Sequence, residues 1–136
     1  MSMLRIFDVA GSAVSAQSQR LNVVASNLAN VDTVATPDGT PYKARQVVFQ
    51  TLMLGAQQAT AGVQVSAITE SSEPGRRVRD PAHPNADAEG YVTYSNVSAV
   101  DEMVNMMSAS RSYQNNIEVM NTARSLLLKT LQIGQG

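Results

Sequence analysis

Cysteine and tryptophan are absent from the 136 residues of this chain, and histidine occurs once. Without cysteine the protein forms no disulfide and no thiolate metal site, which is compatible with either a cytosolic or an exported protein. Aromatic residues make up only 4% of the chain, although large aromatic side chains usually contribute much of a compact core. We therefore expect a core built from leucine, valine, isoleucine and the seven methionines.

Charge is also scarce. Charged residues make up 15% of the chain, against about 25% in an ordinary soluble domain, and the formal net charge at pH 7 is −1. A nearly neutral chain has no electrostatic attraction to nucleic acid or to an anionic membrane surface, so we expect no nucleic-acid partner. Glycine-rich phosphate loops are missing too, and we expect neither a cofactor nor a small-molecule substrate.

Long apolar runs are missing as well. No stretch approaches the roughly 20 apolar residues that a membrane-spanning helix needs. The first residues, MSMLRIFDVAGSAVSAQ, lack the basic and then apolar layout of a cleaved signal peptide. If the protein leaves the cytoplasm, we expect it to use a route that reads no cleavable signal.

The first of two proline-free regions runs from about Ser2 to Val31. Its apolar residues follow the alternating three-and-four spacing of a heptad repeat, which predicts one helix of roughly 45 Å at about 1.5 Å per residue. The expected apolar seam along this helix consists of Phe7, Val14, Leu21, Val24 and Leu28.

The second proline-free region runs from about Val97 to Ile133 and carries a similar repeat. We expect Ser98, three residues before Asp101, to cap the start of this helix. Two narrow seams at opposite ends of a chain pair most simply as an antiparallel hairpin. The expected seam of the second helix consists of Met103, Met106, Tyr113, Ile117, Met120, Leu127 and Leu131.

The region between the helices has a different character, because it contains all five prolines. Four short β-like runs, separated by loops, predict a small β unit; they are Gln46–Leu52, Val63–Ile68, Arg77–Arg79 and Tyr91–Tyr94. The expected fold class is α+β. Residues 1–33 and 97–136 would form a terminal helical coiled-coil domain, and residues 34–96 a small, loop-rich β middle domain.

The polar face of the first helix is poor in charge. Only Arg5, Asp8 and Arg20 are charged before Asp32, and the other polar positions are serine, asparagine and glutamine among alanines. Such a surface is typical of a helix packed among other helices, although a soluble helix that is merely low in charge is the alternative. Because two helices alone bury little apolar area, we expect the terminal segments of an isolated chain to be mobile until neighbours supply contacts.

One cluster suggests a different class of function. The single histidine, His83, lies between Asp80 and Asp87, and this pattern is compatible with a small metal-dependent hydrolase. Two prolines flank the histidine, and there is no second one to complete a common ligand set. We therefore favour a structural loop and expect no catalytic residue and no metal site.

The residues at the end of the first helix resemble a known signature. The sequence Ser26-Asn27-Leu28-Ala29-Asn30, with Thr33 three residues later, is similar to the S-N-(I/L)-A-N-x-x-T pattern of the flagellar rod, hook and hook-associated axial proteins. The segment HPNADAEGYV and the stretches 107–114 and 121–131 are similar to the proximal rod proteins of that family. The resemblance covers essentially the whole chain.

This resemblance implies a structural subunit of the proximal rod in the bacterial flagellar basal body. Such proteins are exported by the flagellar type III apparatus without a cleaved signal, and they self-associate into a helical assembly with other rod proteins and the rod–export-gate adaptor. The motif residues would pack and form amide hydrogen bonds, and the rod would transmit torque. The alternatives are a subunit of another secreted tubular assembly, a cytosolic coiled-coil adaptor, and the hydrolase.

Overall fold

The computed structural model describes residues 3–56 and 60–135, so Ser2, where the first helix is expected to begin, lies outside the described residues. The predicted α+β class, with a long helix at each end and a small β-containing middle, is confirmed. In chain order the elements are α1 (Met3–Ala29), β1 (Arg45–Met53), β2 (Ala61–Glu70), β3 (Arg77–Arg79), β4 (Tyr91–Thr93) and α2 (Ala99–Gln135).

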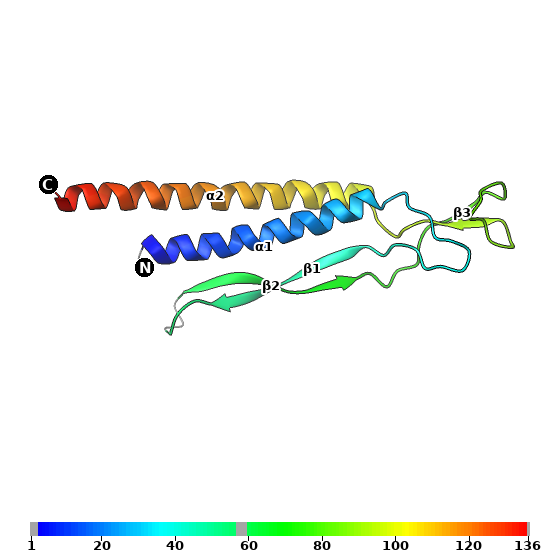
Figure 1. Cartoon of the computed structure of the whole chain (residues 1–136), viewed down its shortest axis with the longest axis horizontal. Coiled ribbons are helices and arrows are strands. Elements are labelled where there is room, and N and C mark those ends of the chain that lie inside the picture. The colour runs from blue at the N-terminus through cyan, green and yellow to red at the C-terminus, as the bar shows by residue number, and fades with distance from the viewer. Residues whose placement is uncertain (1–2, 57–59, 136) are drawn as a thin grey trace.

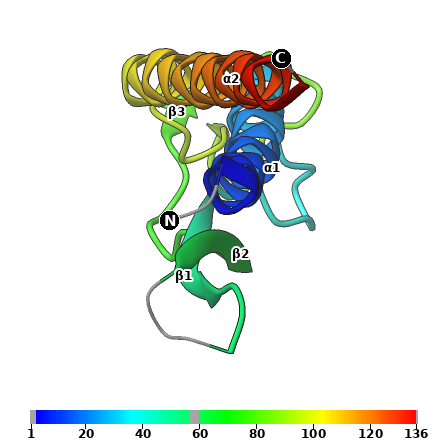
Figure 2. The same cartoon turned by 90° about the vertical axis from the view of Figure 1, so that its left-hand side faces the viewer.

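The molecule is elongated, and its helices run antiparallel along it (Figure 1). Figure 2 shows three layers, in which α1 lies between α2 and the β1–β2 hairpin. The β3–β4 hairpin lies at the opposite end of the molecule from the start of α1 and the end of α2 (Figure 1). The middle of the chain therefore forms two separate two-stranded sheets, of which only the first packs along α1.

Helix α2 begins at the expected cap. The backbone N–H of Asp101 donates to Ser98 Oγ at 3.4 Å, and two acidic residues in the first turn suit the positive end of the helix dipole. With 37 residues against 27, α2 is longer than α1, and its end projects past the start of α1 (Figure 1). Neither helix of the described residues is long and apolar enough to cross a membrane.

The β1–β2 hairpin pairs Arg45 with Glu70 at one end and Met53 with Ala61 at the other, with a register shift between Val48 and Phe49. It approaches α1 closely at Gly62, where a Cβ atom would lie 2.5 Å from Ser12 Oγ. That hydroxyl accepts the backbone N–H of Val63 at 3.1 Å. Only glycine leaves room for this contact between helix and strand.

The core is thin. The buried apolar side chains among the described residues are Ala10, Ala16, Val24, Val92, Ala109 and Ala123. Because four of these six are alanines, the two helices can approach closely but bury little apolar area per residue. Large apolar side chains remain exposed along both helices.

Candidate assembly interface

The end of α1 is joined to the start of β1 through Asn27, whose side chain is completely buried. Its Nδ2 donates to the carbonyl of Arg45 at 2.8 Å. Its Oδ1 accepts the backbone N–H of Arg45 at 3.0 Å and the hydroxyl of Tyr42 at 2.8 Å. A carboxamide is the side chain that can both donate to the C=O and accept from the N–H of one residue's backbone, so this position requires asparagine chemistry.

The other polar residues of the motif shape the turn that follows. Asn30 Nδ2 donates to the carbonyl of Ser26 at 2.8 Å, and Thr33 Oγ1 donates to the carbonyl of Asn30 at 2.8 Å. Ser26 Oγ lies 3.1 Å from the Tyr42 hydroxyl, while Leu28 is half-buried and Ala29 is exposed. These hydrogen bonds satisfy carbonyl groups that the last turn of a helix leaves free.

Most of the expected seam residues are at least partly covered in the single chain. Val24 is buried, and a Cβ atom on Gly11 of α1 would lie 3.9 Å from Met120 Cε of α2. Among the expected seam residues the half-buried ones are Val14, Leu21, Leu28, Met106, Tyr113, Ile117, Met120 and Leu127. Helices α1 and α2 pack against each other, and the assignment of these residues to the seam stays a prediction.

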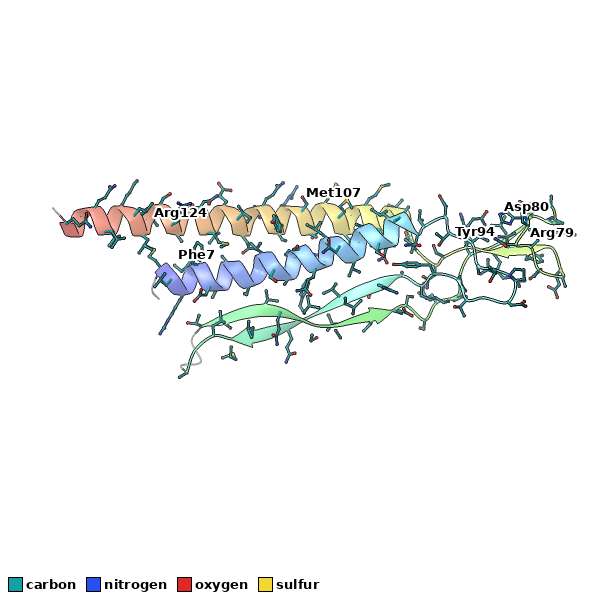
Figure 3. All side chains as sticks on the ribbon, in the orientation of Figure 1. Phe7, Arg79, Asp80, Tyr94, Met107 and Arg124 are labelled. Carbon is teal, nitrogen blue, oxygen red and sulfur yellow. The ribbon has the colours of Figure 1, made fainter. Side chains whose placement is uncertain are left out.

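Three expected seam residues are exposed in the single chain: Phe7 is 39% exposed, Met103 56% and Leu131 54%. Met103 shares an outer stripe with Val100, Val104 and Met107, at spacings of three and four residues. This face of α2 meets no other element of the described chain. Met107 is marked on it in Figure 3.

The first turn of α1 and the end of α2 enclose an apolar cavity of about 210 Å³. Phe7 and Leu127 line it, together with Met3, Leu4 and the Arg124 stem; Phe7 and Arg124 are labelled in Figure 3. The end of α2 projects past Met3, the first described residue of α1 (Figure 1), and Ile133 is 81% exposed. The pairing of the helices is therefore incomplete at this end.

Sequence reasoning missed the most buried residues of α2. Ala109 and Ala123 are buried and lie two heptads apart, but alanine is common on any helix and therefore gives a weak signal. Glu102 is also buried, whereas its place in the first turn of α2 predicted only an interaction with the helix dipole. No pattern in the sequence distinguishes it from its exposed neighbour Asp101.

Asp80, His83 and Asp87 lie in the loop between β3 and β4, and Asp80 is labelled in Figure 3. His83 Nδ1 accepts the backbone N–H of Asn85 at 3.0 Å. Asp87 Oδ1 accepts the backbone N–H groups of Tyr91 and Glu89, each at 2.9 Å. Both side chains thus shape the loop, and the described residues contain no group of three His, Cys, Asp or Glu residues that could hold a metal ion.

Asp87 is also the acceptor for a cation. Arg77 Nη2 donates to Asp87 Oδ2 at 3.1 Å, and its guanidinium lies 4.6 Å from the ring centroid of Tyr91. The N–H of Tyr91 first, and then those of Glu89 and Arg77, hold the pKa of Asp87 below its ordinary value of 3.8. The carboxylate form is therefore the one that organises this loop.

Comparison with known proteins matches the same two helical regions. Residues 7–34 match the model of a family described as flagella basal body rod protein. Residues 88–133 match a model described as flagellar basal body rod FlgEFG protein C-terminal. These two stretches cover most of α1 with its exit turn, and β4 with most of α2, which the structure pairs side by side.

Whole-length relatives agree with these matches. The chain is 60% identical to the flagellar basal-body rod protein FlgC of Salmonella typhimurium, over 99% of this chain and 100% of the relative. It is 59% identical to the FlgC protein of Escherichia coli O6:H1 with the same coverage. It is 38% identical to that of Bacillus subtilis, again over 99% of this chain and 100% of the relative. The chain therefore belongs to the FlgC family of flagellar basal-body rod proteins.

Proposed function

We propose that this protein builds the proximal rod by lateral packing of its terminal helices and so transmits torque from the motor to the hook. Membership of the FlgC family makes it a structural component of the flagellar basal-body rod that assembles with other rod components. The finer mechanism is mechanical: many helices packed side by side around an axis resist twisting, and heterologous contacts between copies propagate as a helix.

The observation that supports this proposal is that the inner faces of the helices are buried, whereas their outer faces leave large apolar side chains exposed. The residues buried between α1 and α2 are small, whereas large apolar side chains lie on their outer faces. Exposed apolar area of this extent marks an interaction surface. Neighbouring subunits that cover the outer faces would bury those side chains.

The residues that we assign to this assembly are the two seams and the turn after α1. The assembly seam is Phe7, Val14, Leu21, Val24, Leu28, Met103, Met106, Tyr113, Ile117, Met120, Leu127 and Leu131. The exposure of Phe7, Met103 and Leu131 in one chain supports a role between chains for these three. Residues 1–33 and 97–136 would act as the packing unit, with 34–96 as the middle domain that shapes its surface.

Further partners are proposed from the family. We expect the rod–export-gate adaptor at one end of the assembly, and export through the flagellar type III apparatus without a cleaved signal peptide. A thin core is compatible with export of an unfolded chain, because little stability has to be overcome before transport. We further propose that the protein catalyses no reaction, since His83 and Asp87 hold backbone groups of their own loop.

The proposal predicts that a charge in the seam abolishes rod assembly. Leu21→Asp or Leu127→Asp places a carboxylate where apolar side chains meet, at a cost of about 2–4 kcal/mol. A strain that lacks the wild-type gene and carries either variant should make no rods and should not swim. Rods are counted in purified basal bodies by electron microscopy, and motility is scored in soft agar.

The matched controls are Leu21→Met and Leu127→Met, which keep the apolar volume and should assemble normally. Normal rods with either aspartate variant would contradict the assignment of that residue to the seam. Absence of the wild-type protein from basal bodies would contradict the proposed function itself.

A further inference from the structure

Glu102, in the first turn of α2, is a buried carboxylate without a partner. The residue is 7% exposed, and its Oε2 has no hydrogen-bond partner in the described chain. The ion pairs formed among the described residues do not include it. A buried polar oxygen without a hydrogen-bond partner destabilises the folded chain, so a donor from outside the single chain would remove this penalty.

Glu102 lines an open cavity of about 330 Å³ formed by α1, β1 and the start of α2. Asn105, Arg20 and Arg45 supply its other polar groups, while Val24 and Phe49 contribute apolar wall. The cavity can therefore accept a side chain that has an apolar stem and a polar head.

The two arginines in this cavity have unused donors. Arg20 Nη1 lies 3.4 Å from Gln17 Oε1, and its Nη2 lies 3.5 Å from Asn105 Oδ1. Arg45 Nε lies 3.6 Å from Glu70 Oε1 in a pair that is about half exposed. All three distances exceed the usual range of about 2.7–3.2 Å, and these contacts use at most two of the five N–H groups on each guanidinium, so each arginine can bind a further acceptor.

The carboxylate and the two arginines of this cavity together determine which kind of side chain can bind in it. An ammonium or guanidinium group would pair with Glu102 but would be repelled by two arginines in the same cavity. A carboxylate would pair with the arginines but would be repelled by Glu102. A carboxamide carries N–H donors and a carbonyl acceptor side by side, so it can donate to Glu102 while it accepts from an arginine.

We propose that this cavity receives the carboxamide of an asparagine or glutamine side chain from a neighbouring rod subunit, an inference that rests on the proposed function. The contact fixes how far the neighbour is rotated against α1 and α2, because both a donor and an acceptor must be aligned. It uses a face of the molecule, between α1 and β1, that is different from the outer apolar stripe of α2.

A photo-reactive amino acid in place of Gln46, an exposed residue that lines the cavity, tests this contact in the assembled rod. After illumination of cells and purification of basal bodies, the cross-linked peptides are identified by mass spectrometry. The expected peptide comes from a neighbouring subunit and contains Asn or Gln at or next to the cross-link. Its sequence tells whether the neighbour is a second copy or another rod protein. An assembled rod without this cross-link, or with one to a peptide that lacks a carboxamide, overturns the proposal.

Two substitutions give an independent readout. Glu102→Leu removes the acceptor without leaving a buried polar group, and it should lower the number of rods per cell at least about tenfold, the effect of losing one charge-assisted hydrogen bond. Glu102→Gln keeps an acceptor oxygen and the same shape, and should stay within about threefold of wild type.

Circular dichroism of both purified variants checks that helix content is unchanged. Rod numbers for Glu102→Leu that equal wild type overturn the proposal. That result would leave the proposed function standing. The proposed function is contradicted only if the wild-type protein is absent from the rod.

Discussion

At the scale of single residues, Asn27 and Asp87 play the same physical role at opposite ends of the polar middle. Each side chain forms hydrogen bonds with backbone groups that have no partner of their own where a helix or strand ends. Asn27 forms three hydrogen bonds at 2.8–3.0 Å to β1 and to the tyrosine before it. Asp87 accepts two backbone N–H groups of the β3–β4 loop at 2.9 Å. Loops without ladder partners need such side chains to satisfy their peptide groups.

Asn27→Ala should destabilise the protein by about 2–4 kcal/mol, because it removes the side chain that bonds the N–H and C=O of Arg45 and leaves the Tyr42 hydroxyl with Ser26 alone. Urea denaturation of the full-length chain, followed by circular dichroism, measures the change. Asn22→Ala is the matched control, since Asn22 is exposed on the same helix, and it should change stability by no more than about 0.5 kcal/mol. Equal urea midpoints of unfolding for the two variants would show that the buried carboxamide of Asn27 does not stabilise the protein.

Asp87 should make the β3–β4 loop sensitive to acid. Its pKa is lowered in the folded loop, so the stabilisation is complete above the ordinary value near 4 and is lost as the pH falls through the lowered pKa. Asp87→Asn should therefore speed amide exchange of Glu89 and Tyr91 at pH 7, and this difference from wild type should disappear at about pH 2. Asp38→Asn, in another exposed turn, is the control and should leave both amides unchanged. If the exchange rates of Asp87→Asn and wild type still differ at about pH 2, the carboxylate charge of Asp87 is not what stabilises the loop.

At the scale of elements, local rules were sufficient to find the helices and strands. The Ser98 cap and the proline-free repeats placed α2 within two residues of its observed bounds, Ala99–Gln135. The four short β-like runs correspond to β1–β4. A glycine often marks the end of a helix, but Gly134 lies inside α2, which continues to Gln135. Such signals act within a few neighbouring residues, so they can be found in the sequence itself.

The contacts between elements could not be predicted in the same way. Around the start of α2, apolar residues at positions 100, 103, 104, 106 and 107 spread over about half of the circumference of the helix, wider than a single seam. Periodicity cannot choose which of these faces meets α1, and it placed the exposed Met103 in the seam beside the half-buried Met106. The position of β1–β2 against α1 and the burial of Glu102 depend on contacts between residues that are far apart in the sequence. The local sequence pattern does not indicate which distant residues will meet.

The contact between the β1–β2 hairpin and α1 should fail if Gly62 gains a single carbon. In Gly62→Ala the new Cβ would lie 2.5 Å from Ser12 Oγ, and Ser12 cannot easily turn away because it also donates to the Val9 carbonyl at 2.7 Å. The expected loss is about 1–3 kcal/mol in thermal unfolding experiments.

Gly134→Ala is the matched substitution for this test. Nothing lies within 4 Å of a Cβ atom at that position, and alanine favours a helix by up to about 1 kcal/mol over glycine. We expect this variant to melt at the same temperature as wild type or slightly higher. If Gly62→Ala also melts no lower than wild type, the close approach of β2 to α1 is not required for stability.

At the scale of the whole molecule, stability should be graded along the long axis. At one end, the asparagine and serine hydrogen bonds join α1 to the β segments, and Ser95 Oγ donates to the Val31 carbonyl at 2.8 Å. At the other end, α2 extends past α1 and leaves Leu128, Leu131 and Ile133 exposed. Fraying costs least where few apolar contacts are lost. The ends of the helices that meet no β structure should thus be the last to order.

Amide hydrogen exchange on the purified chain and on isolated basal bodies tests this gradient. In the dilute chain the first turn of α1 and the last half of α2 should exchange almost freely, because few apolar contacts there offset the entropy of ordering them. In basal bodies the same segments should be protected by about a hundredfold or more, since neighbours then cover their apolar faces. Protection of both segments already in the dilute chain would show that the hairpin is self-sufficient. Rod assembly would then join preformed helices instead of ordering them, and the exposed stripe of α2 would act only as a docking surface.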